Sequence, residues 1–221
     1  MSRAYNLTTC FLQKNRFFLP SFGIVLFLML YLVAAVFYPG GSHHDNCAPR
    51  FDLLHNYWCD LLGERAKNGF VNTARPIALL AMVILGVSLS CLWHDLPHLL
   101  NFRARFGIMR WSMTASMFVM MFLFTTYHDL VIYIAGSLAL IALLQIYYLL
   151  FKTHLWTLLA GGLFCLVLMS VNYYIYFTKN HISILPLLQK VTFILVLFWA
   201  LRLNVAAVRR AKRNYAIKGV L

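Results

Sequence analysis

Apolar residues occur in six long runs along the chain, and polar segments separate them. Each run has about 16 to 23 residues, which at 1.5 Å per residue suits the roughly 30 Å hydrocarbon core of a bilayer. The runs must be helices, because lipid cannot satisfy the open edge of a sheet. The predicted spans are residues 17–38, 76–93, 111–127, 130–151, 155–177 and 182–201. The sequence therefore predicts an all-α, polytopic membrane protein, a six-transmembrane-helix bundle that forms one domain over residues 1–221.

The first and third runs each carry an additional reading. Basic residues precede the run at 17–38 and small residues lie near its end, so a cleaved signal peptide is an alternative. Its apolar core is longer than the roughly 7 to 15 residues of a signal peptide, which favours a retained helix. The run at 111–127 is short, and we expect its helix to extend back through residues 106–110.

One polar segment, residues 39–75, is much longer than an ordinary connection between helices. Such long loops are usually functional or disordered, and the aromatic and leucine residues here argue against disorder. The loop opens with the turn Pro39-Gly40-Gly41. Apolar residues recur at helical spacing over residues 51–62, which predicts a short helix on the outer membrane surface. The residues that share a face of this helix are Asp52, His55 and Cys59 on one side, and Asn56 and Asp60 on another.

The chain is 62% hydrophobic and 11% charged, with a net charge of +13. This composition excludes an ordinary soluble domain, in which about a quarter of the residues are charged. The basic residues lie between the apolar runs and form no recognisable binding stripe, so we expect membrane lipids and no nucleic acid as partners. Both termini in the cytoplasm would put 13 Lys and Arg residues inside and 5 outside, which is the positive-inside bias. Residues 202–221 then form a cytoplasmic basic tail that continues the sixth helix against the inner leaflet.

Acidic residues have the opposite distribution, because four of the six lie in the outer loop. Asp129 lies at the outer end of the fourth span, and Lys190 lies inside the sixth, about 18 Å from its inner boundary. An intramembrane lysine is costly and indicates a functional site with an acidic partner. We name Asp60 or Asp129 as that partner. A structural ion pair, or snorkelling to the outer interface, is the alternative.

Histidine and cysteine residues on the outer side allow two further sites. His55, His128 and Asp129 could hold a metal ion with an open coordination position, but none lies in a metal-binding motif. We favour histidines that hydrogen-bond to headgroups, and we expect no cofactor. Cys47 and Cys59 both lie in the outer loop, on the oxidising side of the membrane, so a disulfide that closes the loop is plausible. Two free thiols are the alternative.

Two short motifs carry a family resemblance. The first runs Asn56-Tyr57-Trp58-Cys59-Asp60-Leu61-Leu62, then Asn68-Gly69 and Asn72-Thr73-Ala74-Arg75-Pro76, and the second is Gln189-Lys190 with Trp199 downstream. They resemble the six-span Frag/DRAM-like membrane proteins, whose bacterial branch of unknown function has an "I-S-D-L-G" element where this chain has Trp58-Cys59-Asp60-Leu61. Asp60 is the matching acid. The resemblance implies a six-helix bundle with the long loop outside, in a bacterial inner membrane, and a link to lipid handling without an established catalytic mechanism.

A second resemblance is to the alkaline-ceramidase-like membrane hydrolases. It rests on Asn72-Thr73 and on Leu85-Gly86-Val87-Ser88 followed by His94-Asp95. Those enzymes gather a serine, an aspartate and three histidines on one side of seven helices. This chain has six predicted spans, and His94 and His181 are predicted to face opposite sides.

Three functions remain at this stage. The leading hypothesis is an outer polar pocket for a lipid headgroup or small amphiphile, formed by Asn56, Asp60, Asp129 and Lys190. One alternative is a metal-dependent lipid hydrolase, and another is a structural or interaction subunit with a protein partner at the outer loop. The sequence has no Gly-x-Ser-x-Gly motif and no phosphate-binding glycine-rich loop, so no catalytic residue is assigned.

Overall fold

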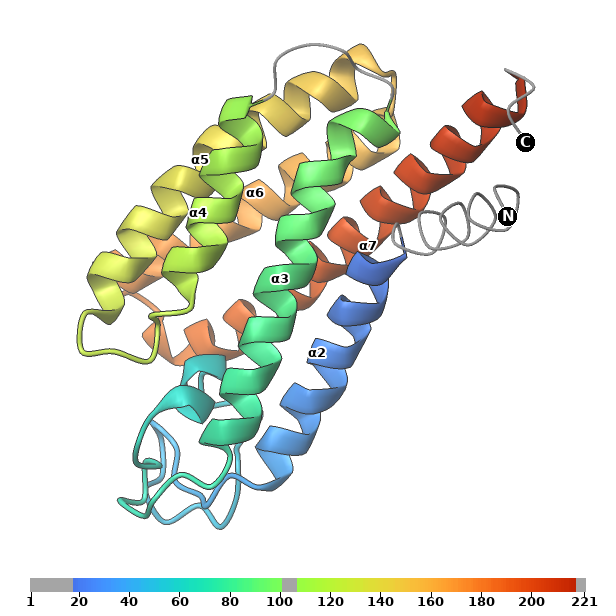
Figure 1. Ribbon diagram of the computed structural model, residues 1–221. Helices are drawn as coiled ribbons and strands as arrows, with labels where there is room; N and C mark the ends of the chain where they lie inside the picture. The colour runs from blue at the N-terminus through green and yellow to red at the C-terminus, as the bar shows by residue number, and fades with distance from the viewer. Residues whose placement is uncertain (1–17, 101–106, 218–221) are drawn as a thin grey trace, which may run out of the picture.

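The computed structural model describes residues 18–100 and 107–217, and every regular element in this part of the chain is helical (Figure 1). Within it, six α-helices and two short 3-10 helices follow one another. The α-helices are α2 (Leu19–Val36), α3 (Arg75–Leu99), α4 (Gly107–Met120), α5 (His128–Lys152), α6 (Trp156–Thr178) and α7 (Leu185–Ile217). The 3-10 helices are η1 (Trp58–Leu62) and η2 (Ile182–Ile184). The predicted all-α class is confirmed.

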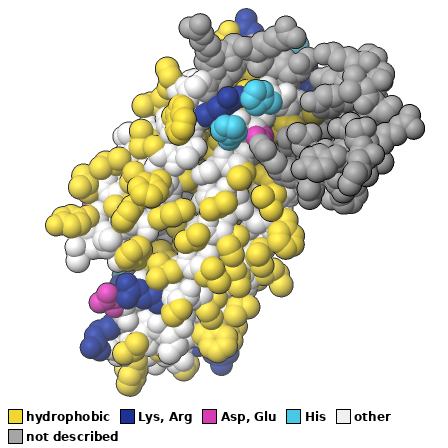
Figure 2. Space-filling model, in the orientation of Figure 1, with side chains coloured by type: hydrophobic (Ala, Val, Ile, Leu, Met, Phe, Trp, Pro, Cys, Tyr) yellow, Lys and Arg dark blue, Asp and Glu magenta, His cyan; other side chains and the backbone are white. Residues whose placement is uncertain are grey.

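Five of the described helices, all except α4, are long and apolar enough to cross a membrane. The shortest, α2, has 18 residues and a length of about 27 Å at 1.5 Å per residue. Their outward faces carry large apolar side chains, and Figure 2 shows such side chains over the middle of the molecule with charged groups nearer its two ends. This distribution is expected of an integral, multi-pass membrane protein.

Helix α4 differs from the predicted third span. It begins at Gly107, within the backward extension that we expected, but it ends at Met120 and not near residue 127. Its 14 residues reach only about 21 Å. Beyond it the backbone tightens, because Phe122 N donates to Val119 O (3.0 Å) and Thr125 N donates to Phe122 O (3.0 Å), each a bond over three residues. The prediction of one α-helix through residue 127 is therefore wrong.

Consecutive helices run in alternating directions (Figure 1). Three connections, residues 37–74, 121–127 and 179–184, consequently lie at one end of the bundle, which we call the loop end. A contact supports this placement, because the Arg75 guanidinium at the start of α3 lies 5.8 Å from the Phe124 ring centre. At the opposite end, Arg210 Nη1 of α7 donates to Thr153 O after α5 (2.8 Å).

Helix α7 is a single helix of 33 residues, about 50 Å long. The segment 202–221, predicted as a tail against the inner leaflet, begins inside it. Leu203, Ala207 and Val208 are buried, and Asn204 Nδ2 donates to Ser21 Oγ of α2 (2.8 Å). The helical continuation is thus as predicted, but its first half packs in the bundle because one face remains apolar.

Small residues and single polar contacts hold the helices close together. A Cβ atom on Gly23 of α2 would lie 1.7 Å from Ser88 Oγ of α3, so this pair needs glycine. Across the α6–α7 seam, Asn172 Nδ2 donates to Thr192 Oγ1 (2.8 Å), an interhelical hydrogen bond. These are common devices of helix packing in lipid, where apolar burial gives no preference for protein over acyl chains.

We predict that Gly23→Ala destabilises the bundle, because its methyl group pushes α2 away from α3. Overpacking of this kind costs about 1–3 kcal/mol, so the melting temperature of the detergent-solubilised protein should fall by several degrees. Gly161→Ala is the matched control, since a Cβ atom there lies 3.4 Å from the Trp199 ring. The double variant Gly23→Ala/Ser88→Gly should recover part of the loss. Equal melting temperatures for the two single variants would contradict the prediction.

Candidate functional site

The first loop is closed by a turn that only glycine suits. Gly40 and Gly41 have φ values of +121° and +80°, in the left-handed region. A Cβ atom on Gly41 would lie 2.3 Å from the backbone N of Asn68. Asn68 in turn donates from its backbone N to Gly40 O (3.3 Å) and from Nδ2 to Pro39 O (2.8 Å). The beginning and the later part of the loop are therefore pinned together.

The middle of the loop is not the α-helix predicted over residues 51–62. Turns lead to η1, which is five residues long. The reason is local competition for backbone donors: Asp52 Oδ1 accepts from Leu54 N (2.8 Å), and Asn56 Oδ1 accepts from Asp52 N (2.8 Å). The expected pairing of residues nevertheless holds for Asn56 with Asp60, and for Asp52 with His55.

Asn56 is the central hydrogen-bonding residue of the loop and is fully buried. Its Nδ2 atom donates to Gly41 O (3.0 Å) and to Asp60 Oδ2 (3.1 Å). With Oδ1 bound to Asp52, the whole amide is used by the protein. Asn56 therefore supports the site from within and leaves no side-chain atom free for a ligand.

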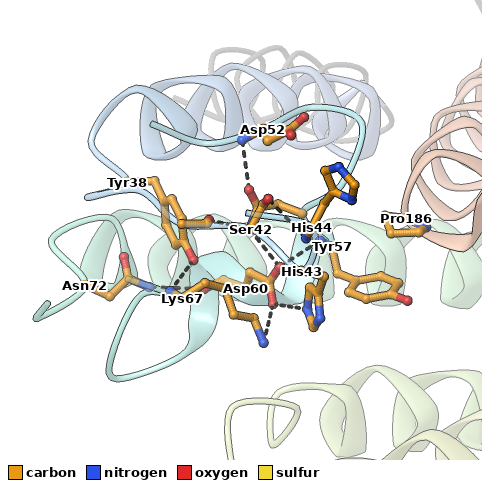
Figure 3. A network of polar contacts seen from close by, with 12 residues as sticks. Tyr38, Ser42, His43, His44, Asp52, Tyr57, Asp60, Lys67, Asn72 and Pro186 are labelled. Atoms are coloured by element: carbon orange, nitrogen blue, oxygen red, sulfur yellow. Dashed lines mark hydrogen bonds and ion pairs between the residues drawn. The ribbon is translucent and has the colours of Figure 1, made fainter. Parts of the chain in front are cut away.

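Asp60 is the acid on which the polar groups converge (Figure 3). Its Oδ2 accepts from Tyr57 N (2.8 Å) at the start of η1, in addition to the Asn56 amide. Its Oδ1 lies 3.4 Å from His43 Nε2 and 3.5 Å from Lys67 Nζ. The Asp60 side chain is 7% exposed, whereas those of His43 and Lys67 are 42% and 37% exposed. A nearly buried carboxylate thus lies next to the Lys67 ammonium and the His43 imidazole, both of which reach solvent.

Lys190 joins this network from α7, at the loop end. It is buried, and its ammonium donates to the backbone O of Asn56 and to Pro186 O (3.0 Å). The Phe51 ring centre lies 5.8 Å away. The negative charges of Asp60 and Asp52 act on the ammonium. Lys190 thereby anchors the loop to the bundle.

The predicted direct partner of Lys190 is corrected by this geometry. No ion pair joins Lys190 to Asp60 or to Asp129 among the residues that the structure describes. Asn56 stands between Lys190 and Asp60, with its carbonyl on the lysine and its amide on the carboxylate. Asp60 has Lys67 as its ion-pair partner.

Asp129 belongs to a different place. Its Oδ1 accepts from Tyr176 OH (2.7 Å) and lies 3.3 Å from His128 Nδ1, and the side chain is 64% exposed. His55 instead pairs with Asp52 (2.7 Å) and stacks on the His44 ring at 4.7 Å. The alternative metal site of His55, His128 and Asp129 is therefore wrong, and the described residues contain no group of three or more metal-ligating side chains.

The Asp52–His55 pair has an electrostatic effect within the loop. Partial burial opposes ionisation of Asp52, but the hydrogen bonds from the His55 ring and from the Leu54 amide outweigh it and lower the pKa of this carboxyl. Asp52 therefore stays ionised, and its local bonds stay formed, until the pH falls below the ordinary range of an aspartate.

The two loop cysteines are both free thiols, so the predicted disulfide between Cys47 and Cys59 is absent. Cys47 is exposed. Burial, and secondarily the charge of Asp60, raise the pKa of the Cys59 thiol to about 12. Cys59, the second residue of η1, thus behaves as a small apolar side chain.

Asn72 is a second structural asparagine, which occurs in the motifs of both family resemblances but was not among the predicted site residues. Its Nδ2 atom lies within hydrogen-bonding distance of three carbonyl oxygens, those of Asp60, Leu61 and Gly63. Its Oδ1 accepts from Ala74 N (3.1 Å) just before α3. His43 and Lys67 were also missed as partners of Asp60. The only signal for them was their presence in the same loop, because their contacts span 17 and 7 positions of irregular chain.

Comparisons with protein-family models, with curated proteins and with solved structures found no match. The resemblance to Frag/DRAM-like proteins accordingly stays a prediction from two motifs. In this structure the residues of those motifs have defined local roles: Asn56, Asp60 and Asn72 organise the loop, and Lys190 fastens it to α7.

We predict that Lys190→Met loosens the loop, because it leaves the buried carbonyl of Asn56 without its charged donor. A hydrogen bond to a charged group contributes about 1.5–3 kcal/mol, so amide hydrogen exchange in the peptide covering residues 56–62 should accelerate about tenfold or more. Lys179→Met is the control, because the Lys179 ammonium lies over the Tyr176 ring at 4.1 Å and near Asp129, outside the first loop. Unchanged exchange in Lys190→Met would show that the anchor is unimportant.

Proposed function

We propose that the chain is a six-span protein of a bacterial inner membrane that binds a lipid headgroup or small amphiphile at its loop end. Five long apolar helices support five of the crossings. For the sixth, α4 supplies about 21 Å, and the tightened turns at residues 121–125 add about 10 Å at 2.0 Å per residue. The sum approaches the roughly 30 Å of the hydrocarbon core.

The proposed orientation places the loop end outside the cytoplasm and both termini inside. Basic residues in the last part of α7 support it, because Arg209, Arg210, Lys212 and Arg213 all lie at the end opposite the loop. Short segments rich in lysine and arginine are retained on the cytoplasmic side. The bacterial assignment comes from the family resemblance.

The observation that carries the binding proposal is the pairing of a nearly buried Asp60 with half-exposed His43 and Lys67. This cluster lies at the loop end of the bundle, where lipid headgroups would surround it in the proposed orientation. A headgroup phosphate would accept from Lys67 and from His43, and a headgroup amine would donate to Asp60 Oδ1. Asn56 and Lys190, both already committed to the protein, would hold the site in place and not touch the ligand.

A protein partner at the loop is a second candidate, favoured by one observation. Phe70 and Val71 are exposed on a short turn that is fixed by the hydrogen bond from Ala66 N to Phe70 O (2.9 Å). Exposed apolar side chains on an ordered turn are typical of contact surfaces. Substitutions at Phe70 and Val71 leave the Asp60 cluster intact, which separates the two candidates.

The orientation predicts that a membrane-impermeant maleimide added outside intact cells labels Cys47. Cys59 is the internal control on the same loop, because its raised pKa and partial burial should keep it unreactive at pH 8. Peptide mass spectrometry after labelling distinguishes the two. Denaturation without reductant should make Cys59 reactive as well. If Cys47 were labelled only after the membrane is permeabilised, the loop end would face the cytoplasm and the proposed orientation would be wrong.

The headgroup proposal predicts that His43→Ala/Lys67→Ala reduces retained phospholipid. The full chain would be purified in detergent with added phosphatidylethanolamine and phosphatidylglycerol, and bound lipid counted by native mass spectrometry. Loss of two charge-assisted hydrogen bonds should weaken retention about tenfold or more. The controls are Arg65→Ala, an exposed cation outside the cluster, and Phe70→Ser/Val71→Ser. Retention equal to that of the controls would remove the headgroup proposal.

A further inference from the structure

Three polar atoms near the loop end of α7 are shielded from solvent and have no hydrogen-bond partner among the described residues. They are Trp58 Nε1 of η1, Gln189 Oε1 of α7 and Asn172 Oδ1 of α6. Leaving such a group unpaired costs about 1–3 kcal/mol, and native proteins satisfy nearly all of them. The other shielded atoms of this kind, Arg75 Nε, Trp93 Nε1 and Arg110 Nε, are all donors on α3 and α4.

The three residues lie along one stretch of α7. Gln189 lies one helical turn before Thr192 and Phe193, so it shares their side of the helix. Thr192 accepts from Asn172 of α6 at 2.8 Å. The Phe193 ring centre lies 6.3 Å from that of Trp58 in η1. Gln189 therefore faces the seam in which α6 and η1 both meet α7.

The seam has apolar walls as well as polar atoms. The Phe27 and Tyr31 rings of α2 complete an aromatic cluster with Trp58 and Phe193, at centroid distances of 5.6 Å for Phe27–Phe193 and 5.0 Å for Tyr31–Trp58. Polar atoms at fixed positions among aromatic walls are typical of a small-molecule site.

The seam also borders the lipid-facing surface. Gln189 and Asn172 are only partly buried as residues, although their oxygens are shielded. A molecule in the outer leaflet could thus enter between α6 and α7.

We propose that this seam binds a hydroxyl-bearing amphiphile, with its hydroxyl groups among Trp58 Nε1, Gln189 Oε1 and Asn172 Oδ1. One indole donor and two carbonyl acceptors require a group that both accepts and donates. Vicinal hydroxyls of a glycerol unit do both, and they suit either orientation of the Gln189 amide. An ester only accepts, and a quaternary ammonium does neither.

This inference names the chemical class of the part of the amphiphile that lies below the headgroup. It rests on the proposed function for the side and depth of the membrane. Lys190 follows Gln189 directly in α7 and holds the loop that carries the Asp60 cluster. A single amphiphile could therefore place its polar head at Asp60 and its glycerol unit in the seam.

The test compares two probes of equal chain length, monolauroylglycerol and methyl laurate, on the full chain in detergent. Equilibrium dialysis with labelled probe would measure binding. We expect the monoacylglycerol to bind at least about tenfold more tightly than the methyl ester, because only the monoacylglycerol can form hydrogen bonds with all three unpaired atoms. Trp58→Phe and Gln189→Met should each weaken monoacylglycerol binding about threefold to tenfold, which corresponds to one lost hydrogen bond. Gln189→Met should leave binding of the methyl ester unchanged, because an ester has no donor for Gln189 Oε1.

Trp93→Phe is the matched control, since it removes another shielded indole donor outside the seam. Equal binding of the two probes would overturn the inference. So would variants at Trp58 and Gln189 that change only the melting temperature, because a buried water would then be the sole occupant. If the probe difference persists while His43→Ala/Lys67→Ala leaves phospholipid retention unchanged, the seam stands and the headgroup proposal alone fails.

Discussion

The buried ammonium of Lys190 is the constraint around which the loop end is built. A charged side chain in an apolar helix must find a polar partner, because neither lipid nor aromatic walls can solvate it. Here the partner is a backbone carbonyl, that of Asn56, which belongs to the loop and not to another helix. Satisfying one lysine therefore fixes the position of about forty residues of irregular chain against α7.

The loop can accept this anchor because its own polar groups are satisfied internally. Asn56 and Asn72 replace the regular ladders of a helix or strand, each holding several backbone groups that would otherwise be buried without a partner. The glycine turn at Gly40 and Gly41 brings the two sides of the loop together. Asp60, His43 and Lys67 form a charged cluster that reaches the surface of the loop. Rigid support with an accessible charged rim is what a selective binding surface requires.

Much of the fold could be predicted from hydrophobic runs, because lipid imposes helices of nearly fixed length. Five of the six runs correspond to long helices. The prediction for the third run was wrong beyond Met120, because a switch to tighter turns leaves no signature in hydropathy. At the loop end, the importance of Asn56, Asp60 and Lys190 was predictable, because burying a polar group near an apolar bundle costs free energy unless the group has a partner. Their pairing was not, since it depends on a backbone carbonyl that no residue type reveals. The metal site failed because His55 and Asp129 lie in different places, although both are at the loop end. The disulfide failed because proximity in a loop sequence does not specify which way side chains point.

Helix α7 is fastened by a cation at each end, Lys190 to the carbonyl of Asn56 and Arg210 to the carbonyl of Thr153. Twenty residues of unbroken helix separate these two points, a distance of about 30 Å. Such a rod cannot rotate or slide without straining one of its fastenings. Both hydrogen bonds end on a backbone carbonyl and not on a side chain. A substitution at position 56 or 153 would therefore leave the acceptor atom itself in place. One helix thereby couples the two ends of the bundle mechanically. A displacement of the loop that moves Lys190 would also move Arg210 and the connection between α5 and α6.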